Sequence, residues 1–334
     1  MTRERPECSI VVRAFNEERH LDRLFDGIEQ QTVRDVEVVV VDSGSTDATP
    51  ALAGRRGARV VAVAPEQFSF GRSLNVGCGA TVAPVIVVAS AHVFPVFKDW
   101  LERLIAPFAH PDVALVYGRQ RGGETTRYSE HQVFTQWFGE LSNPAQDHPF
   151  CNNANASIRR SVWERVPYDE GLTGLEDIAW AKAVRALGMR VWYEATAEVV
   201  HLHDETPARV FNRYRREALA LRQIFPEERF SLRAFVRLFA GNVSSDLYHA
   251  AHDRVMWRNV RWIVLFRLMQ LWGTYRGFTQ RRPASGRLLR TFYYPRTRAR
   301  RLGPSGSSEA RGRVEYAGPT ARRGDRPADP PRGA

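Results

Sequence analysis

The stretch EVVVVDSGSTD, residues 37–47, decides the fold of this 334-residue chain. Its four consecutive valines, residues 38–41, are β-branched and suit a strand that is buried on both faces, as in a parallel sheet. The run ends at Asp42, and Ser-Gly-Ser then supplies turn chemistry before a helix that Asp47 or the preceding threonine caps. The stretch therefore predicts a carboxylate at the carboxyl end of a central strand, the edge where open α/β sheets bind ligands.

Strands and helices alternate on both sides of this stretch, which predicts a doubly wound α/β sheet. The first strand, the first helix and the valine strand form a βαβ unit, whose crossover is expected to be right-handed. We expect strands at residues 8–12, 38–41, 59–64, 81–89, 113–117 and 191–200, and helices at 20–31, 50–57, within 95–112 and at 178–187, with a further helix carrying Leu74, Val76 and Cys78.

The positive charge of the chain is concentrated at its C-terminal end. The formal net charge is +11, but residues 281–334 alone hold fourteen arginines and four acidic residues, which leaves almost no net charge on the rest. A nucleic-acid-binding surface on the main domain is therefore not expected. The hydrophobic content of 43% is ordinary for a globular core, so most of the chain is expected to fold.

Cysteine usage and hydropathy indicate a protein of the reducing cytosol. Cys8, Cys78 and Cys151 fit neither a zinc site nor a disulfide framework. The N-terminal residues carry no long apolar run before a cleavage site, so no secretory signal is expected. The longest strongly apolar run, residues 262–272, is too short to span a bilayer and contains Arg267.

The first strand is followed by RAFNEE, residues 13–18, and not by a glycine-rich loop. The absence of GxGxxG and of a Walker sequence at this turn counts against dinucleotide binding and P-loop chemistry. Asn16 and Glu17 offer polar groups that suit a base or a ribose, but such residues are also common at the start of a helix. The residues alone leave both interpretations open.

Two segments together resemble a known family. SIVVRAFNEERHLDRLFDGIEQQ, residues 9–31, followed by EVVVVDSGSTDAT, residues 37–49, is similar to the nucleotide-sugar half of family 2 glycosyltransferases of the GT-A fold, and the resemblance continues to about residue 225. It implies a mixed, mostly parallel α/β sheet flanked by helices. It also implies that the first-loop residues and the aspartate of the second strand hold the donor nucleoside; here these are Arg13, Phe15, Glu17 and Asp42.

The segment QFSFGRSLNVG, residues 67–77, resembles the rhamnosyltransferase-like members of this family. Arg72 is placed to reach the donor diphosphate, and Asn75 to orient the ribose or the base. The glycine before Arg72 permits close approach of the backbone to a ligand. A solvated helix position is the alternative for Arg72.

Residues 90–92, Ser-Ala-His, stand where most GT-A enzymes have Asp-x-Asp, and a subset of the family resembles this chain in having Ser-x-His. Carboxylates suit Mg²⁺ or Mn²⁺, whereas one hydroxyl and one imidazole make a poorer hard-cation site, which counts against a divalent cofactor. Either His92 is a single metal ligand completed by water and diphosphate, or Arg72 and His92 stabilise the leaving diphosphate with little need of metal. Ser90 and His92 are donor-site candidates in both cases.

A second pair of histidines follows the strand predicted at residues 191–200. Alternation along the strand places His201 and His203 on one face. The resemblance implies that a histidine here lies near the donor phosphates or the metal. We therefore predict His203, together with His92, as a metal ligand.

The acceptor side is expected in FCNNANASIRR, residues 150–160, whose Asn152, Asn153 and Asn155 either bind sugar hydroxyls or are ordinary turn formers. Residues 119–147, rich in polar and helix-breaking residues, are expected to form a surface or acceptor-facing segment. Neither segment carries a motif that identifies the acceptor.

Glu176 and Asp177 resemble the family's Glu-Asp pair at the start of a helix. Backbone N–H groups and the helix dipole hold a carboxylate at that position. In an inverting transferase a carboxylate takes the proton from the acceptor hydroxyl as it attacks the anomeric carbon. We predict Asp177 as this base and Glu176 as an acceptor-positioning residue; the alternative is that both only cap the helix.

The chain is expected to divide into three parts. Residues 1–228 form the GT-A domain, residues 229–295 a helical region, and residues 296–334 a disordered tail rich in Arg, Gly and Pro. The basic and aromatic helices suit either an anionic membrane surface or packing against the sheet.

The motifs predict an inverting transferase that moves a hexose or deoxyhexose from a nucleotide diphosphate sugar to a sugar or lipid-linked acceptor, in polysaccharide, cell-envelope or glycolipid synthesis. A cytoplasmic location, at the inner face of the cell membrane, is expected. A sugar nucleotidyltransferase is one alternative, although RAFNEE is not the glycine-rich loop that such an enzyme needs. The other is a membrane-associated scaffold with a decayed site, which is motivated by the missing Asp-x-Asp.

Overall fold

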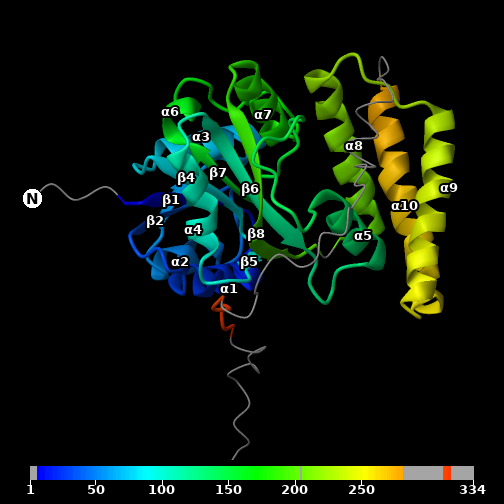
Figure 1. Ribbon diagram of the computed structural model, residues 1–334, viewed down its shortest axis with the longest axis horizontal. Helices are drawn as coiled ribbons and strands as arrows, with labels where there is room; N and C mark the ends of the chain where they lie inside the picture. The colour runs from blue at the N-terminus through cyan, green and yellow to red at the C-terminus, as the bar shows by residue number, and fades with distance from the viewer. Residues whose placement is uncertain (1–5, 204, 281–310, 317–334) are drawn as a thin grey trace, which may run out of the picture.

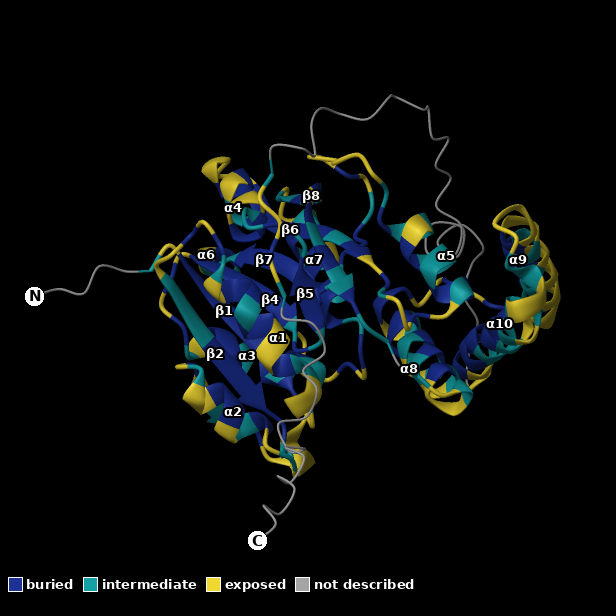
Figure 2. Ribbon diagram, turned by 90° about the horizontal axis from the view of Figure 1, so that it is seen from below, coloured by how far each residue is buried: buried dark blue, intermediate teal, exposed yellow. Residues whose placement is uncertain are grey.

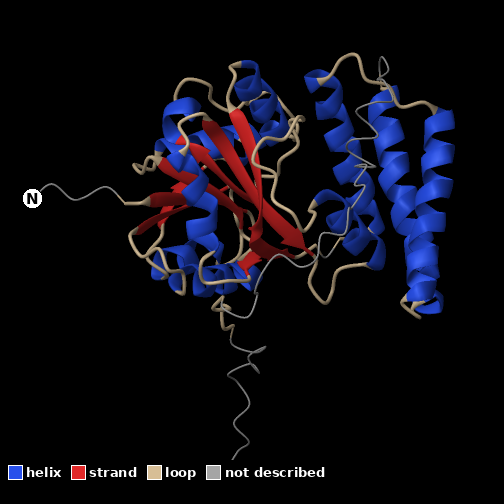
Figure 3. Ribbon diagram, viewed as in Figure 1, coloured by secondary structure: helices blue, strands red, loops and turns tan. Residues whose placement is uncertain are grey.

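An eight-stranded sheet forms the centre of the molecule (Figure 3). The structure is a computed structural model that describes residues 6–203, 205–280 and 311–316. The strands are β1 Cys8–Ala14, β2 Val36–Asp42, β3 Arg59–Ala62, β4 Val85–Ser90, β5 Val93–Pro95, β6 Val113–Arg121, β7 Asn155–Arg159 and β8 Arg190–His201, in the order β3-β2-β1-β4-β7-β6-β8-β5. The pairs among β3, β2, β1 and β4, and the pair of β6 with β8, are parallel, whereas β7 and β5 run antiparallel to their neighbours. The predicted mixed, mostly parallel sheet is confirmed.

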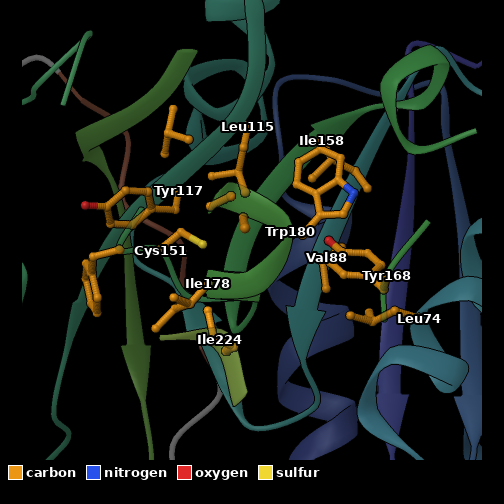
Figure 4. Packing of buried hydrophobic residues seen from close by; sticks show 14 of the residues in the cluster. Leu74, Val88, Leu115, Tyr117, Cys151, Ile158, Tyr168, Ile178, Trp180 and Ile224 are labelled. Carbon is orange, nitrogen blue, oxygen red and sulfur yellow. The ribbon is translucent and has the colours of Figure 1, made fainter. Parts of the chain in front are cut away.

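Helices cover both faces of this sheet (Figure 1). They are α1 Glu18–Glu29, α2 Thr49–Arg55, α3 Phe70–Gly79, α4 Trp100–Ile105, α5 Tyr128–Trp137, α6 Arg160–Trp163, α7 Glu176–Ala186, α8 Pro207–Ile224, α9 Leu232–His252 and α10 Met256–Thr279, with short 3-10 turns η1 Pro65–Gln67 and η2 Ala106–Ala109. Successive strand residues point to opposite faces, so Ile10 of β1 packs with α1, α2 and α4, and Val11 with α3 and α7. Figure 4 shows Leu74 and Trp180 in the second of these layers.

The valine run forms β2 as predicted, and residues 39–41 are fully buried. Asp42 is the last residue of the strand. Ala14 of β1 pairs with Asp42, while Arg13 pairs with Ser90 of β4. The carboxyl ends of these three parallel strands therefore meet at one edge of the sheet.

Helices α8, α9 and α10 stand beside the sheet, and α5 lies against them (Figure 1). Helix α10 approaches α8 closely, because a Cβ atom on Gly273 would lie 2.4 Å from the carbonyl oxygen of Phe211. Residues 119–147, predicted as a surface or acceptor-facing segment, contain the helix α5. Helix α8 lies before the predicted boundary at residue 228 and packs with α10, which lies after it, and the predicted division into domains stays a prediction.

The apolar run at residues 262–272 lies inside α10. Its Arg267 is fully buried and donates to Asp246 of α9 at 2.8 Å. This partner is needed because an unpaired buried charge is strongly destabilising. Figure 2 shows that the outer face of α9 is largely exposed. Within the described ranges, no helix has the length and apolar character that crossing a membrane requires.

The C-terminal tail, predicted to be disordered throughout, contains an ordered segment. Residues 311–316 lie on the sheet edge beside β5, and Val314 is buried there. The prediction of disorder is wrong for this segment. The other residues of the predicted tail, and residues 281–295 of the predicted helical region, lie outside the described residues.

Candidate active site

Asp42, at the carboxyl end of β2, has one carboxylate oxygen bound to the protein and one that is not. The backbone N–H groups of Gly44 and Ser45 each donate to Oδ2 at 3.1 Å. Oδ1 is buried and has no hydrogen-bond partner in the part of the chain that the structure describes. Because an unpaired buried oxygen is costly, Oδ1 suits a donor group on a ligand.

The loop after β1 is tied to the loop after β2. Asn16, in the left-handed region at φ 55°, accepts a hydrogen bond from the N–H of Thr46, and its own N–H donates to Ser45. Phe15 is 56% exposed at this junction. An exposed ring beside a carboxylate suits a planar base with polar edges, so Phe15 and Asp42 form a candidate nucleoside site.

Arg13, at the end of β1, contacts the acidic pair of α7. Its Nη1 lies 2.9 Å from Oε1 of Glu176, and its guanidinium lies 4.9 Å from the centre of the Phe70 ring. This ion pair joins the β1 edge to the start of α7, two parts of the chain that are far apart in sequence. Nη1 of Arg13 is engaged with Glu176, and the predicted nucleoside contact of Arg13 stays a prediction.

Asp177 lies buried in the first turn of α7. The N–H of Asn153 donates to its Oδ2 at 3.0 Å, and the N–H of Ile178 to its Oδ1 at 2.8 Å. Burial and then the charge of Glu176 raise the pKa of Asp177 to about 7, against the opposing effect of these N–H groups and of Arg13. A carboxyl group with this pKa can take up a proton near neutral pH.

Three histidines meet near the ends of β4 and β8. The candidate ligand atoms of His92, His201 and His203 lie within 4.8 Å of one another. The Nδ1 atom of each ring contacts an oxygen, from Glu17 at 2.8 Å, Gln120 at 2.7 Å and Glu130 at 2.7 Å respectively. Burial lowers the pKa of His201 and of His203 well below the ordinary value, so both rings are neutral at pH 7. Neutral rings oriented by oxygen partners are the form in which histidines bind metals.

A cavity of about 150 Å³ lies where α5, α7 and α8 meet the ends of β6 and β8. Asp177, His201 and His203 line its polar part, and an aromatic wall that includes Phe134 and Trp137 lines the rest. The cavity therefore brings the candidate base and two of the histidines together. Asp42 is not among its lining residues, so the predicted shared cleft of Asp42 and Asp177 stays a prediction.

The chain from β1 to α6 matches a known family. Residues 9–166 match the glycosyl transferase family 2 model. These residues form a glycosyl transferase family 2 domain. It is 26% identical over 221 residues to the O-antigen chain rhamnosyltransferase RfbN of Salmonella typhimurium, across 62% of this chain and 70% of that protein. Glycosyltransferase AglE of Haloferax volcanii is 24% identical, across 72% of this chain and 80% of its own length.

The fold of this glycosyltransferase is also that of solved GT-A structures. The mannosyltransferase PcManGT of Pyrobaculum calidifontis superposes with a TM-score of 0.54 at 20% identity, across 81% of this chain and 84% of that one. Glucosyl-3-phosphoglycerate synthase of Mycobacterium tuberculosis gives 0.50 at 22% identity, across 66% and 80%. The family domain and the rhamnosyltransferase relatives support a glycosyltransferase, and they set aside the sugar nucleotidyltransferase and the non-catalytic scaffold; the solved structures show the fold.

Two predicted donor-site residues of the glycosyltransferase make contacts within the protein. The Asn75 amide donates to Glu170 and to the carbonyl of Tyr168, and accepts from the N–H of Tyr168 and from Trp163. These bonds use its hydrogen-bonding capacity, so its predicted contact with ribose or base is not supported. Arg72 is half-exposed and lies 3.6 Å from Glu170, and its reach toward a diphosphate stays a prediction.

The three asparagines predicted for the acceptor side have three different positions. Asn155 is fully buried at the start of β7 and bonds to Trp100 and to two backbone carbonyls, so its predicted sugar contact is wrong. Asn153 is buried behind the acidic pair, where it supports Asp177. Only Asn152 of the three lines the cavity.

Several cavity residues of the glycosyltransferase were missed in the sequence. Glu130 of α5 accepts from Arg213 of α8 at 2.8 Å, and it also contacts His203. No local pattern points to this pair, because its partners come from different elements. Phe134, Trp137 and Phe138 do have helical spacing, and this signal could have identified α5.

Proposed function

We propose that this glycosyltransferase moves a sugar from a nucleotide diphosphate sugar to an acceptor hydroxyl, with inversion at the anomeric carbon, in the synthesis of an O-antigen-type polysaccharide or a related cell-envelope glycan. The observation that carries the proposal is Asp177, a buried carboxyl group on a cavity wall whose pKa is raised to about 7. The similarity to RfbN supports a hexose or deoxyhexose as the transferred sugar.

Asp177 is the base of a single displacement. The acceptor hydroxyl gives its proton to the Asp177 carboxylate while its oxygen bonds to the anomeric carbon and the bond from that carbon to the diphosphate breaks. Burial makes this carboxylate a stronger base than an exposed aspartate. Glu176, held by Arg13, lies next to Asp177, raises the Asp177 pKa further and positions the acceptor.

The donor nucleoside binds at the carboxyl edge of β1 and β2. Asp42 Oδ1, which lacks a partner among the described residues, accepts a hydrogen bond from the base or the ribose, and the exposed Phe15 ring stacks on the base. Glu17, which was predicted at the nucleoside, also contacts Nδ1 of His92 at 2.8 Å and orients that ring toward the diphosphate.

A divalent cation fits between His92, His201 and His203. Each Nδ1 atom is held by an oxygen, which leaves the second ring nitrogen as a ligand. Ser90 Oγ lies 3.1 Å from Nε2 of His92, and a cation bound to this nitrogen would displace that contact. Three imidazoles suit Mn²⁺ or another transition ion better than Mg²⁺. When bound, such a cation neutralises charge on the leaving diphosphate. This proposed site adds His201 to the pair, His92 and His203, that the sequence predicts as metal ligands.

The acceptor sugar binds in the cavity beside Asp177. The rings of Trp137 and Phe150 lie 4.3 Å apart and form part of its aromatic wall. Pockets of this kind combine an apolar wall, which covers the C–H face of a sugar ring, with a few polar groups that fix its hydroxyls. Asn152 and Asp177 are such polar groups here.

The variant Trp137→Ala is expected to raise the acceptor KM roughly tenfold, which corresponds to about 1.4 kcal/mol of lost binding. Donor KM and donor hydrolysis should stay within about twofold of wild type, because the ring lies on the acceptor side. Steady-state kinetics with each substrate varied in turn measures both. Trp137→Phe keeps an aromatic wall and serves as the control. A raised donor KM with an unchanged acceptor KM would contradict this assignment.

The turn between α9 and α10 is suited to an anionic membrane surface. Trp257 is 84% and Tyr248 72% exposed near this turn, and Arg254, Arg258 and Arg261 flank them. Aromatic and basic side chains of this kind bind at lipid headgroups. We therefore propose that the enzyme works at the cytoplasmic face of the membrane, where a lipid-linked acceptor would be available.

Incubation of the purified protein with a panel of nucleotide diphosphate sugars, and with free or lipid-linked saccharide acceptors, tests the proposed function. One donor should be consumed with release of its nucleoside diphosphate, and the product should have the opposite anomeric configuration by NMR. Retained configuration would exclude a single displacement. Neither transfer nor hydrolysis of any donor would contradict the function itself.

A further inference from the structure

The segment RGRVEY, residues 311–316, extends the sheet edge just after β5; it is the red segment in Figure 1. Phe97 and Arg313 form an antiparallel bridge. The N–H of Val314 donates to the carbonyl of Val96 at 3.1 Å, and the N–H of Lys98 donates to the carbonyl of Gly312 at 2.8 Å. Main-chain pairing of this kind is how an extended peptide adds to a sheet edge.

Side chains hold both ends of the segment. Arg311 donates to both carboxylate oxygens of Asp99, with a shortest distance of 2.6 Å. Gln30 exchanges two hydrogen bonds with the backbone of Glu315, at 2.7 and 2.8 Å. The hydroxyl of Tyr316 donates to the carbonyl of Pro95 at 2.7 Å. Contacts from β5, α1 and the start of α4 therefore all converge on one short piece of the C-terminal chain.

The same edge carries His92. Strand β5 begins at Val93, directly after His92, and Val93 pairs with His201 of β8. Val96 donates its N–H to Glu198 at 3.0 Å and accepts from Val314 with its carbonyl, so it is held between β8 and the segment.

A chain of aromatic rings follows the same route. Tyr316 lies 6.1 Å from Phe94, Phe94 lies 6.3 Å from His20, and His20 lies 6.3 Å from His92, measured between ring centres. The guanidinium of Arg23 covers both Phe94 and Tyr316. A displacement of Tyr316 would therefore change the packing of the His92 ring through this series of neighbouring rings.

We propose that residues 311–316 are a positioning segment, which pairs with residues 96–98 directly after β5 and thereby fixes His92 against Glu17 and His201. A strand as short as β5 with one unpaired side is a weak support for an active-site residue. The segment anchors the residues that directly follow this strand, and it comes from a distant part of the chain. The effect of the segment on catalysis rests on the proposed function, because the segment acts through His92. The docking of the segment on the sheet edge is independent of that function.

Two truncations separate the segment from the rest of the tail. Deleting residues 311–334 should accelerate exchange of the Lys98 amide roughly tenfold or more, since that amide loses its acceptor. It should also lower Tm by about 3 °C and kcat/KM roughly tenfold. Deleting only residues 317–334 keeps the segment and should change none of these. In the full-length chain, Val314→Asp should behave like the longer deletion and Glu315→Gln like wild type.

The His92→Ala background distinguishes positioning from general stabilisation. In this background, deletion of residues 311–334 should still accelerate exchange of the Lys98 amide. It should change kcat/KM by less than about twofold, because the His92 side chain that the segment positions is already absent. A further tenfold loss would show that the segment does not act through His92. Unchanged Lys98 exchange after deletion of residues 311–334 would overturn the docking itself. A full-length protein that protects Lys98 but transfers no sugar would instead overturn the proposed function.

Discussion

Asp177→Asn is expected to lower kcat/KM for sugar transfer about 10³-fold, within the range for loss of a general base. The amide keeps the shape of the side chain and can still accept from the N–H of Asn153, but it cannot take the proton of the acceptor hydroxyl. Initial rates at pH 8, with donor and acceptor varied, measure the effect. Asp169→Asn makes the same chemical change at an exposed position before α7 and should stay within about twofold of wild type.

Loss of activity in Asp177→Asn should not reflect unfolding. The pKa of Asp177 is raised in the folded protein, so ionisation of this carboxyl group destabilises the fold. The destabilisation grows as the pH rises from the unfolded pKa toward about 7, and it is complete above that pH. Asparagine removes this cost but leaves one of the two N–H groups, of Asn153 or Ile178, without its acceptor, so the Tm at pH 8 should stay within about 3 °C of wild type. A folded Asp177→Asn protein with wild-type turnover would exclude Asp177 as the base.

Removal of divalent cations is expected to have the second largest effect. EDTA should lower transfer roughly 100-fold, since the charge on the leaving diphosphate would lose its main stabilisation. Added Mn²⁺ should restore more activity than Mg²⁺ at equal concentration, because three imidazoles favour the softer ion. Rates measured after dialysis against chelator, followed by titration with each metal, give the comparison.

Variants of the histidines connect this effect to the site. His92→Ala and His203→Ala should each weaken Mn²⁺ binding at least about tenfold by calorimetry. His110→Ala, an exposed histidine remote from the cluster in sequence, should bind Mn²⁺ as wild type does. Full turnover in EDTA would contradict the cation site and favour the alternative in which Arg72 and His92 stabilise the diphosphate directly.

Much of the donor half could be predicted because its signals are local. Four valines followed by Asp42 indicate a buried strand and a carboxylate at its end, and the sheet register then fixes which neighbours share that edge. The role of Asp42 toward a nucleoside is still a prediction, supported by its unpaired Oδ1 atom.

The acceptor half could not be predicted to the same degree. Asn152, Asn153 and Asn155 are the same residue type within four positions, and only the start of β7 decides which one lines the cavity and which is in the core. The wall supplied by α5 and the ion pair of Glu130 with Arg213 depend on how distant elements pack. The spacing of residues along the chain does not predict such contacts between distant elements.

The segment at residues 311–316 was missed for a related reason. Its arginines and glycine match the composition of the surrounding tail, which is typical of disorder. Two of its attachments are backbone bonds to Val96 and Lys98, which any residue can make, and its side-chain partners Asp99 and Gln30 lie far away in sequence. Among the described residues of that tail, Val314 is buried, and Tyr316 is half-buried with its hydroxyl on the carbonyl of Pro95.

The pH dependence of kcat/KM tests the central claim most directly, because it reports the ionisation of the base in the free enzyme. With Asp177 as the base, activity should fall on the acid side with an apparent pKa near 7, about tenfold for each pH unit below it. Rates from pH 5 to pH 9, with stability checked at each pH, give this profile. A rate that stays constant down to pH 5 would mean that the essential base has an ordinary carboxylate pKa, and would contradict the assignment of Asp177.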